Sequence, residues 1–213
     1  MNAGPAGPVS RSDAFNLLLL ESTPWGVVTL DRRGCVLAIN GRGRKAIERG
    51  DGLEVKDGEL HAFRSADDRS LQIEIELSLK SACGERPHTG GTVPVGRRGV
   101  PVPYGLRVLP MQHTDDPLTD GAPFVIVLIA DPVDPGLPSP DDLIAIFGLT
   151  PREAEVALYI AHGLSVAEVT DRMEISRNTV RTHLANAMTK TGAHSRGAFI
   201  GLIRGLPIRN ERL

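Results

Sequence analysis

Aromatic residues, cysteines and long apolar runs are scarce in this chain. Aromatic side chains make up only 4% of the sequence, too few for the stacking platforms that bind single-stranded nucleic acids. Its two cysteines, Cys35 and Cys83, cannot form a disulfide framework, which favours a reduced, cytoplasmic compartment. The longest apolar run, residues 123–130, is too short to span a bilayer, and the N-terminus has no secretory signal. We therefore expect a soluble cytoplasmic protein without membrane association.

Motifs for catalysis or cofactor binding are also lacking. His61, His88 and His113 do not have the spacing of metal ligands, so we expect no metal or haem. The glycine pair Gly90–Gly91 predicts a turn, because a phosphate-binding loop needs other glycine spacing between a strand and a helix. Asp31 has no acidic cluster beside it of the kind a phosphorylated receiver domain needs. No nucleophile has a base placed to activate it, so we predict no cofactor and no enzymatic activity.

The chain of 213 residues is long enough for two modest domains. Prolines gather in residues 131–140, which can sustain neither a helix nor a central strand and are typical of a semi-rigid linker. We predict a disordered N-terminus over residues 1–12, a first domain over 13–131, a linker over 132–142 and a second domain over 143–213.

Strand and helix patterns alternate through the first domain. Two apolar runs, Gly26–Leu30 and 35–39, flank a polar turn ending in Gly34 and predict a hairpin. Three further strands are expected at residues 92–95, 104–109 and 124–130. Helices are expected at 12–20, 42–49 and 66–81, and a second short hairpin at 53–55 and 59–62. The order predicts an α+β domain with an antiparallel five-stranded sheet and helices on one side.

Residues 25–34, followed by 36–40, resemble the opening hairpin and helix entry of PAS-like sensor domains. The resemblance covers residues 13–131. It implies a cavity between helices and sheet that could bind a small-molecule ligand, and an opening helix that could dimerise. Leu71, Ile75 and Leu79 share one face of the predicted helix 66–81. They would form either the core or the wall of such a pocket.

Four helix starts in the second domain carry an N-capping residue, and two of these are capping boxes, in which a glutamate three residues later returns the hydrogen bond. The caps are Thr150, Ser165, Ser176 and Ser195, with Glu153 and Glu168 completing the boxes. Gly163 and Gly192 suit helix ends. A three-residue turn, residues 174–176, joins the second helix to the third, so these helices should cross steeply. The sequence predicts an all-α, four-helix domain with a helix-turn-helix.

Positive charge is concentrated in this second domain. From Ile175 to the end, seven Lys and Arg residues accompany one Glu, a net charge of +6, whereas the whole chain carries −2 and the preceding part therefore −8. This asymmetry indicates a polyanion-binding end. On the third helix, arginine can bind guanine bidentately, and threonine and alanine methyl groups can contact thymine. Residues predicted to contact phosphate are Ser176, Arg177, Thr179, His183, Asn186, Lys190 and Arg196. His183 lies between two inward residues, so a partly buried structural role is an equal alternative.

Four motifs in this domain closely resemble the LuxR-type DNA-binding domain of bacterial regulators. They are residues 149–153, 163–165, 175–176 and 179–183, within a continuous match over 149–203. The resemblance implies a homodimer on a two-fold-related site in double-stranded DNA, with the third helix in the major groove. It also implies base contacts from Arg181, Thr182 and Ala185. Ala185 stands where many members carry a polar or basic residue, and Thr170 replaces a small apolar residue, so its hydroxyl needs a partner.

These patterns together predict a transcription regulator. The third helix of the second domain would read DNA, and the first domain would control dimerisation or sense a signal. Two alternatives remain at this point, each with DNA binding secondary. The first domain could be chiefly a small-molecule sensor, or it could dock another protein.

Overall fold

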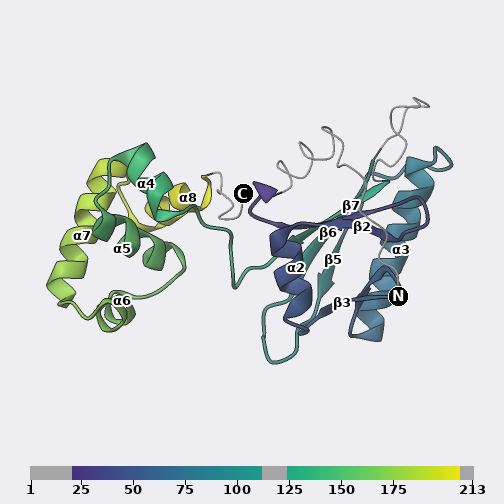
Figure 1. Ribbon diagram of the computed structural model, residues 1–213, viewed down its shortest axis with the longest axis horizontal. Helices are drawn as coiled ribbons and strands as arrows, with labels where there is room; N and C mark the ends of the chain where they lie inside the picture. The colour runs from purple at the N-terminus through teal and green to yellow at the C-terminus, as the bar shows by residue number, and fades with distance from the viewer. Residues whose placement is uncertain (1–20, 112–123, 207–213) are drawn as a thin grey trace, which may run out of the picture. The chain divides into compact units, whose positions relative to one another are not determined.

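The computed structural model describes residues 21–111 and 124–206, and the chain divides into two compact units between Val133 and Asp134 (Figure 1). The predicted disordered residues 1–12 and the predicted helix 12–20 lie outside the described residues. The division between the units falls within the proline-rich segment.

A five-stranded antiparallel sheet forms the centre of the first unit, in the order β2-β1-β7-β6-β5. Its strands are β1 Gly26–Leu30, β2 Val36–Ile39, β5 Gly91–Val95, β6 Tyr104–Pro110 and β7 Val125–Ala130. The first strand, β1, therefore pairs with the last, β7, and both lie inside the sheet rather than at its edges. A separate hairpin consists of β3 Leu53–Lys56 and β4 Glu59–Ala62. Both the predicted antiparallel sheet and the predicted second hairpin are confirmed.

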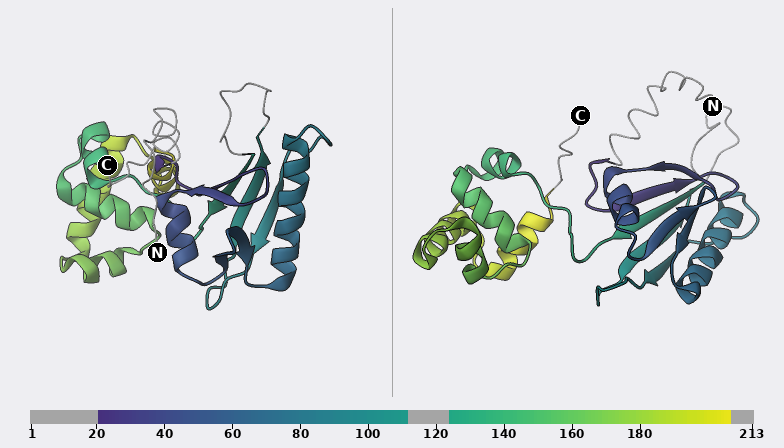
Figure 2. Two further views of the ribbon diagram at one scale, coloured as in Figure 1. Left: turned by 45° about the vertical axis from the view of Figure 1, so that its right-hand side comes forward. Right: turned by 60° about the horizontal axis from the view of Figure 1, so that its bottom comes forward.

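Two helices, α2 Gly41–Glu48 and α3 Ser65–Ala82, pack on this sheet (Figure 2). Helix α2 approaches β1 closely, because a Cβ on Gly26 would lie only 2.9 Å from the Cα of Gly43. Asn40 fixes this approach, since its Oδ1 accepts the backbone N–H groups of Val27 and Gly43, both at 2.8 Å. One buried amide side chain thus caps α2 and joins it to the sheet.

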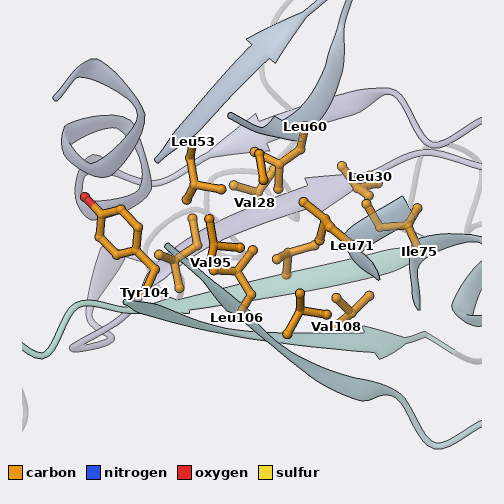
Figure 3. Close-up of a cluster of buried hydrophobic side chains, with 14 of the residues drawn as sticks. Val28, Leu30, Leu53, Leu60, Leu71, Ile75, Val95, Tyr104, Leu106 and Val108 are labelled. Carbon is orange, nitrogen blue, oxygen red and sulfur yellow. The ribbon is translucent and has the colours of Figure 1, made fainter. Parts of the chain in front are cut away.

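An apolar core fills the space between the sheet, the two helices and the β3–β4 hairpin (Figure 3). Alternate strand residues point into it. Labelled examples are Val28, Leu30, Val95, Leu106 and Val108. The face of α3 that carries Leu71, Ile75 and Leu79 lies in this core. Burying each such aliphatic side chain stabilises the fold by about 1.5–3 kcal/mol.

A buried arginine closes one end of this core. The Arg97 side chain is 3% exposed; its Nε and Nη2 donate to Asp51 Oδ2 at 2.9 and 2.7 Å, and its Nη1 donates to Asp131 Oδ1 at 2.9 Å. The guanidinium lies 4.1 Å from the ring centroid of Tyr104, whose hydroxyl donates to Asp51 Oδ1 at 2.9 Å. Burial and this hydrogen bond raise the pKa of Tyr104 to about 12. Asp131 directly follows β7 and also accepts the N–H of Val133 at 3.0 Å. The network therefore holds the point where the chain leaves the first unit.

Replacing Arg97 by Met should destabilise the first unit strongly. Asp131 keeps its ion pair with Arg49, but Asp51 loses its cation in a buried site. We therefore expect the free energy of unfolding to fall by about 3 kcal/mol. Urea unfolding followed by the fluorescence of Trp25 measures this loss. Arg107→Met, an exposed change on β6, is the matched control and should stay within about 0.5 kcal/mol. Equal losses in the two variants would contradict the assigned role of Arg97.

Five helices are described in the second unit. They are α4 Pro140–Phe147, α5 Pro151–Ala161, α6 Val166–Met173, α7 Arg177–Thr191 and α8 Arg196–Arg204. The last four were predicted, but α4 begins inside the segment 132–142 that was predicted as linker, so both the linker end and the four-helix count are corrected. Pro140 suits the first helical position, where no N–H is needed, and Ser139 and Asp142 form a capping box. Leu143 then anchors α4 in the helical core.

The helical core is separate from that of the first unit. It draws fully buried side chains from all five helices, among them Leu143, Ile160, Val169, Val180 and Phe199. Across residues 21–111 and 124–206, no helix combines the length and apolar character needed to cross a membrane.

Candidate nucleic-acid interface

A left-handed residue makes the turn between α6 and α7. Glu174 has φ 56° and ψ 39°, a conformation that glycine or asparagine usually occupies. The N–H groups of Glu174 and Ile175 both bond to the carbonyl of Thr170. Ser176 then starts α7 by accepting the N–H of Thr179 at 3.1 Å. The predicted turn over 174–176 and the predicted cap are confirmed.

Both predicted capping boxes are present. In α5, the Thr150 hydroxyl accepts the N–H of Glu153, whose carboxylate accepts the N–H of Thr150 at 2.8 Å. Ser165 and Glu168 make the same exchange at the start of α6. The Thr170 hydroxyl has the partner it needs, since it donates to the carbonyl of Val166 at 2.8 Å. Helices α5 and α6 therefore form a defined support for α7.

Helix α7 turns one face toward this support and the other outward. Val180 and Ala187 are fully buried, with Leu184 and Met188 partly buried beside them. The three predicted base-reading residues, Arg181, Thr182 and Ala185, are all exposed. Positions three or four residues apart share a helix face, so Ala185 lies beside both Arg181 and Thr182 on one exposed surface.

The predicted phosphate-contacting residues divide by their surroundings. Arg177 and Asn186 are exposed, as is Ser176, whose hydroxyl lies 2.8 Å from that of Thr179. His183 is partly buried, in keeping with the structural alternative. Within the described part of the chain neither Arg177 nor Arg181 forms an ion pair. Both guanidinium groups are therefore available to a ligand.

Two predicted phosphate contacts have partners within their own unit. Lys190 Nζ donates to Glu153 Oε2 at 2.7 Å and to the carbonyl of Gly148 at 3.1 Å. Arg196 Nη2 donates to the carbonyl of Leu164 at 2.7 Å. The Lys190 ammonium is therefore already paired, although its side chain stays 36% exposed. This pairing could not be predicted from sequence, because the two partners are separated by 37 residues.

Glu153 is 4% exposed, and its carboxylate is the buried centre of this contact. Burial opposes ionisation of the group. The hydrogen bonds from Lys190 and from the Thr150 backbone outweigh burial and hold the pKa of Glu153 below its ordinary value. The carboxylate is therefore ionised at neutral pH and paired with the ammonium.

Among residues 21–111 and 124–206, no group of three or more His, Cys, Asp or Glu side chains could hold a metal ion.

The stability of the second unit should depend on pH through Glu153. Because its pKa is lower in the folded than in the unfolded state, its contribution is complete above the unfolded value, about 4.3, and is lost as pH falls below it. We expect the melting temperature of the wild type to fall more steeply than that of Glu153→Gln between about pH 5 and 3. Circular dichroism at each pH measures both transitions. Parallel curves would mean that the carboxylate does not contribute in this way.

The comparisons with known proteins agree with this helical arrangement. Residues 148–202 match the family described as bacterial regulatory proteins, luxR family. This part of the chain is therefore a LuxR-family helix-turn-helix domain. The response regulator RamR of Streptomyces coelicolor is 38% identical over 56 residues, which are 26% of this chain and 28% of that protein. The chain thus spans little more than a quarter of the length of this relative.

Similar solved structures include VqmA, a LuxR-type receptor. A complex of VqmA from Vibrio cholerae with ligand and DNA is 15% identical and covers 89% of this chain and 86% of that chain, with a TM-score of 0.36. A phage VqmA bound to DPO is 14% identical and covers 91% and 89%, also with a TM-score of 0.36. The PAS-like character of the first unit stays a prediction.

Proposed function

We propose that this protein regulates transcription by binding double-stranded DNA through α7. The observation that supports this most directly is the exposed surface of Arg181, Thr182 and Ala185 within a LuxR-family domain. An arginine there can donate two hydrogen bonds to a guanine edge, and the two methyl groups can contact thymine. Arg177 and Asn186, exposed on the same helix, would contact the phosphates that set the register of the helix on DNA.

Dimerisation is the second part of the proposal. A single α7 reads only a few base pairs, so a regulator of this kind gains specificity from two copies on related half-sites. The first unit would hold the two helical units in a suitable arrangement, with or without a bound signal molecule. Support comes from the Arg97 network, because Asp131 and Val133 fix the chain at its exit from the first unit. A change in the core around Tyr104 would thereby reach the segment that leads to the DNA-binding unit.

Arg181→Ala should reduce discrimination between DNA sequences. The probes are a duplex selected by the wild-type chain from a random library and a scrambled duplex of equal length. We expect affinity for the selected duplex to fall at least tenfold, in line with the loss of a bidentate base contact worth about 1–3 kcal/mol. Fluorescence anisotropy measures both affinities.

The control for Arg181→Ala is Lys45→Ala, which removes one exposed positive charge from α2 in the first unit. It should leave the ratio of the two affinities unchanged. If Arg181→Ala also preserved that ratio, α7 would not read bases through this residue.

Two chains should bind each selected duplex. Because half-sites on one face of DNA are separated by about one helical turn, or 34–36 Å, the site should contain two related halves with that spacing. Sedimentation of the complex, together with the sequence of the selected duplex, tests the stoichiometry and the symmetry. One chain on an asymmetric site would refute the dimer proposal while leaving DNA binding intact.

A further inference from the structure

Three helices meet at the side chain of Lys190. This residue lies in the last turn of α7, and its ammonium binds both Glu153, near the start of α5, and the carbonyl of Gly148, which ends α4 in a left-handed conformation with φ 64°. The side chain of Lys190 is 36% exposed, whereas that of Glu153 is 5% exposed. The contact therefore joins a surface cation to a buried anion.

One carboxylate oxygen has two roles in this contact. Glu153 Oε2 accepts the N–H of Thr150 at 2.8 Å and the ammonium of Lys190 at 2.7 Å. The anion lies at the N-terminal end of α5, while the cation lies at the C-terminal ends of α4 and α7, so each charge also interacts favourably with the helix dipoles. Moving the ammonium to a DNA phosphate would leave a buried carboxylate without its cation, which is costly. Lys190 is thus committed to its own unit.

We propose that Lys190 is a positioning residue for DNA reading, whose ion pair with Glu153 sets the angle at which α7 presents Arg181. Helix α7 is anchored at its start by the turn from α6 and along its inward face by Val180 and Ala187. The Lys190 pair adds an anchor at the far end. Arg181 precedes Lys190 by nine residues, about 13 Å along the helix. A pivot of α7 would therefore displace the base-reading side chains, and bidentate base contacts tolerate displacement less than phosphate contacts do.

The dependence of DNA binding on salt separates positioning from phosphate contact. Each phosphate contact contributes about 0.9 to the slope of log affinity against log salt concentration. A Lys190 that positions α7 contributes nothing to this slope. If Lys190 contacted a phosphate instead, removing the Glu153 charge would free the ammonium for that contact. The affinity for DNA would then stay the same or rise. The two roles thus predict opposite results for the Glu153 variant.

The test uses the full chain and the two duplexes defined above, because the inference rests on the proposed function. The variants are Lys190→Met, Glu153→Gln and their combination, with Arg177→Met as the matched loss of a cation that has no ion pair. Each is measured at a temperature where circular dichroism shows it fully folded. We expect both single variants to bind the selected duplex about tenfold more weakly, as for one lost base contact. Their salt slopes and their affinity for the scrambled duplex should match the wild type.

The remaining variants complete the comparison. The double variant should lose no more affinity than either single variant, because both changes remove one interaction. Arg177→Met should instead lower the salt slope by about 0.9 and weaken binding to both duplexes alike.

Two results would overturn the positioning role. A slope reduced by about 0.9 in Lys190→Met, with unchanged affinity in Glu153→Gln, would make Lys190 a phosphate contact. Wild-type affinity in both folded variants would restrict the pair to stabilising the fold. Failure of the wild-type chain to enrich any duplex would overturn the proposed function itself, a result obtained before any variant is made.

Discussion

The second unit depends on one buried carboxylate. Glu153 caps α5 and pairs with Lys190 in the last turn of α7, and the same ammonium binds the carbonyl of Gly148, which ends α4. The pair thus joins three helices whose apolar faces alone would allow them to slide. Apolar contacts are non-directional and stabilise many similar packings almost equally. A paired charge with defined hydrogen-bond geometry selects one of them. The exposed face of α7 has a single orientation largely because this anion needs its partners.

The first unit has a comparable arrangement of opposite sign. Arg97 is a cation held by two carboxylates at the end of an apolar core, and Glu153 is an anion held by an ammonium at the edge of another. Replacing a buried ion pair by apolar residues is often neutral for stability. Removing only one partner is costly, because the other charge stays buried, but the intact pair contributes mainly by fixing geometry. In both units the paired groups come from segments distant in sequence and fix the direction of the chain at a junction.

Local signals explain why so much of the second unit could be predicted from sequence. A cap such as Thr150, Ser165 or Ser176 acts within three residues of itself, so short patterns contain the whole interaction. Helix α4 was missed because the prolines around Ser139 are equally typical of a linker and of a helix start. The left-handed Glu174 gave no sign, since neither glycine nor asparagine stands there. In the first unit, alternating apolar residues predicted the strands, but the pairing of Arg97 with Asp51 and Asp131 has no local pattern.

The net charge counted along the sequence overstates the positive charge that the second unit can present to DNA phosphates. The net charge of +6 after Ile175 includes Lys190, which the structure assigns to Glu153, and Arg196, which is bonded to a carbonyl. Arg177 and Arg181 are the cations on α7 without an ion pair among the described residues. Non-specific affinity rises with the number of phosphates neutralised, so one such helix should bind DNA weakly at physiological salt. A regulator built in this way gains affinity mainly by placing two helices on one duplex. Control of that placement is the role we propose for the first unit.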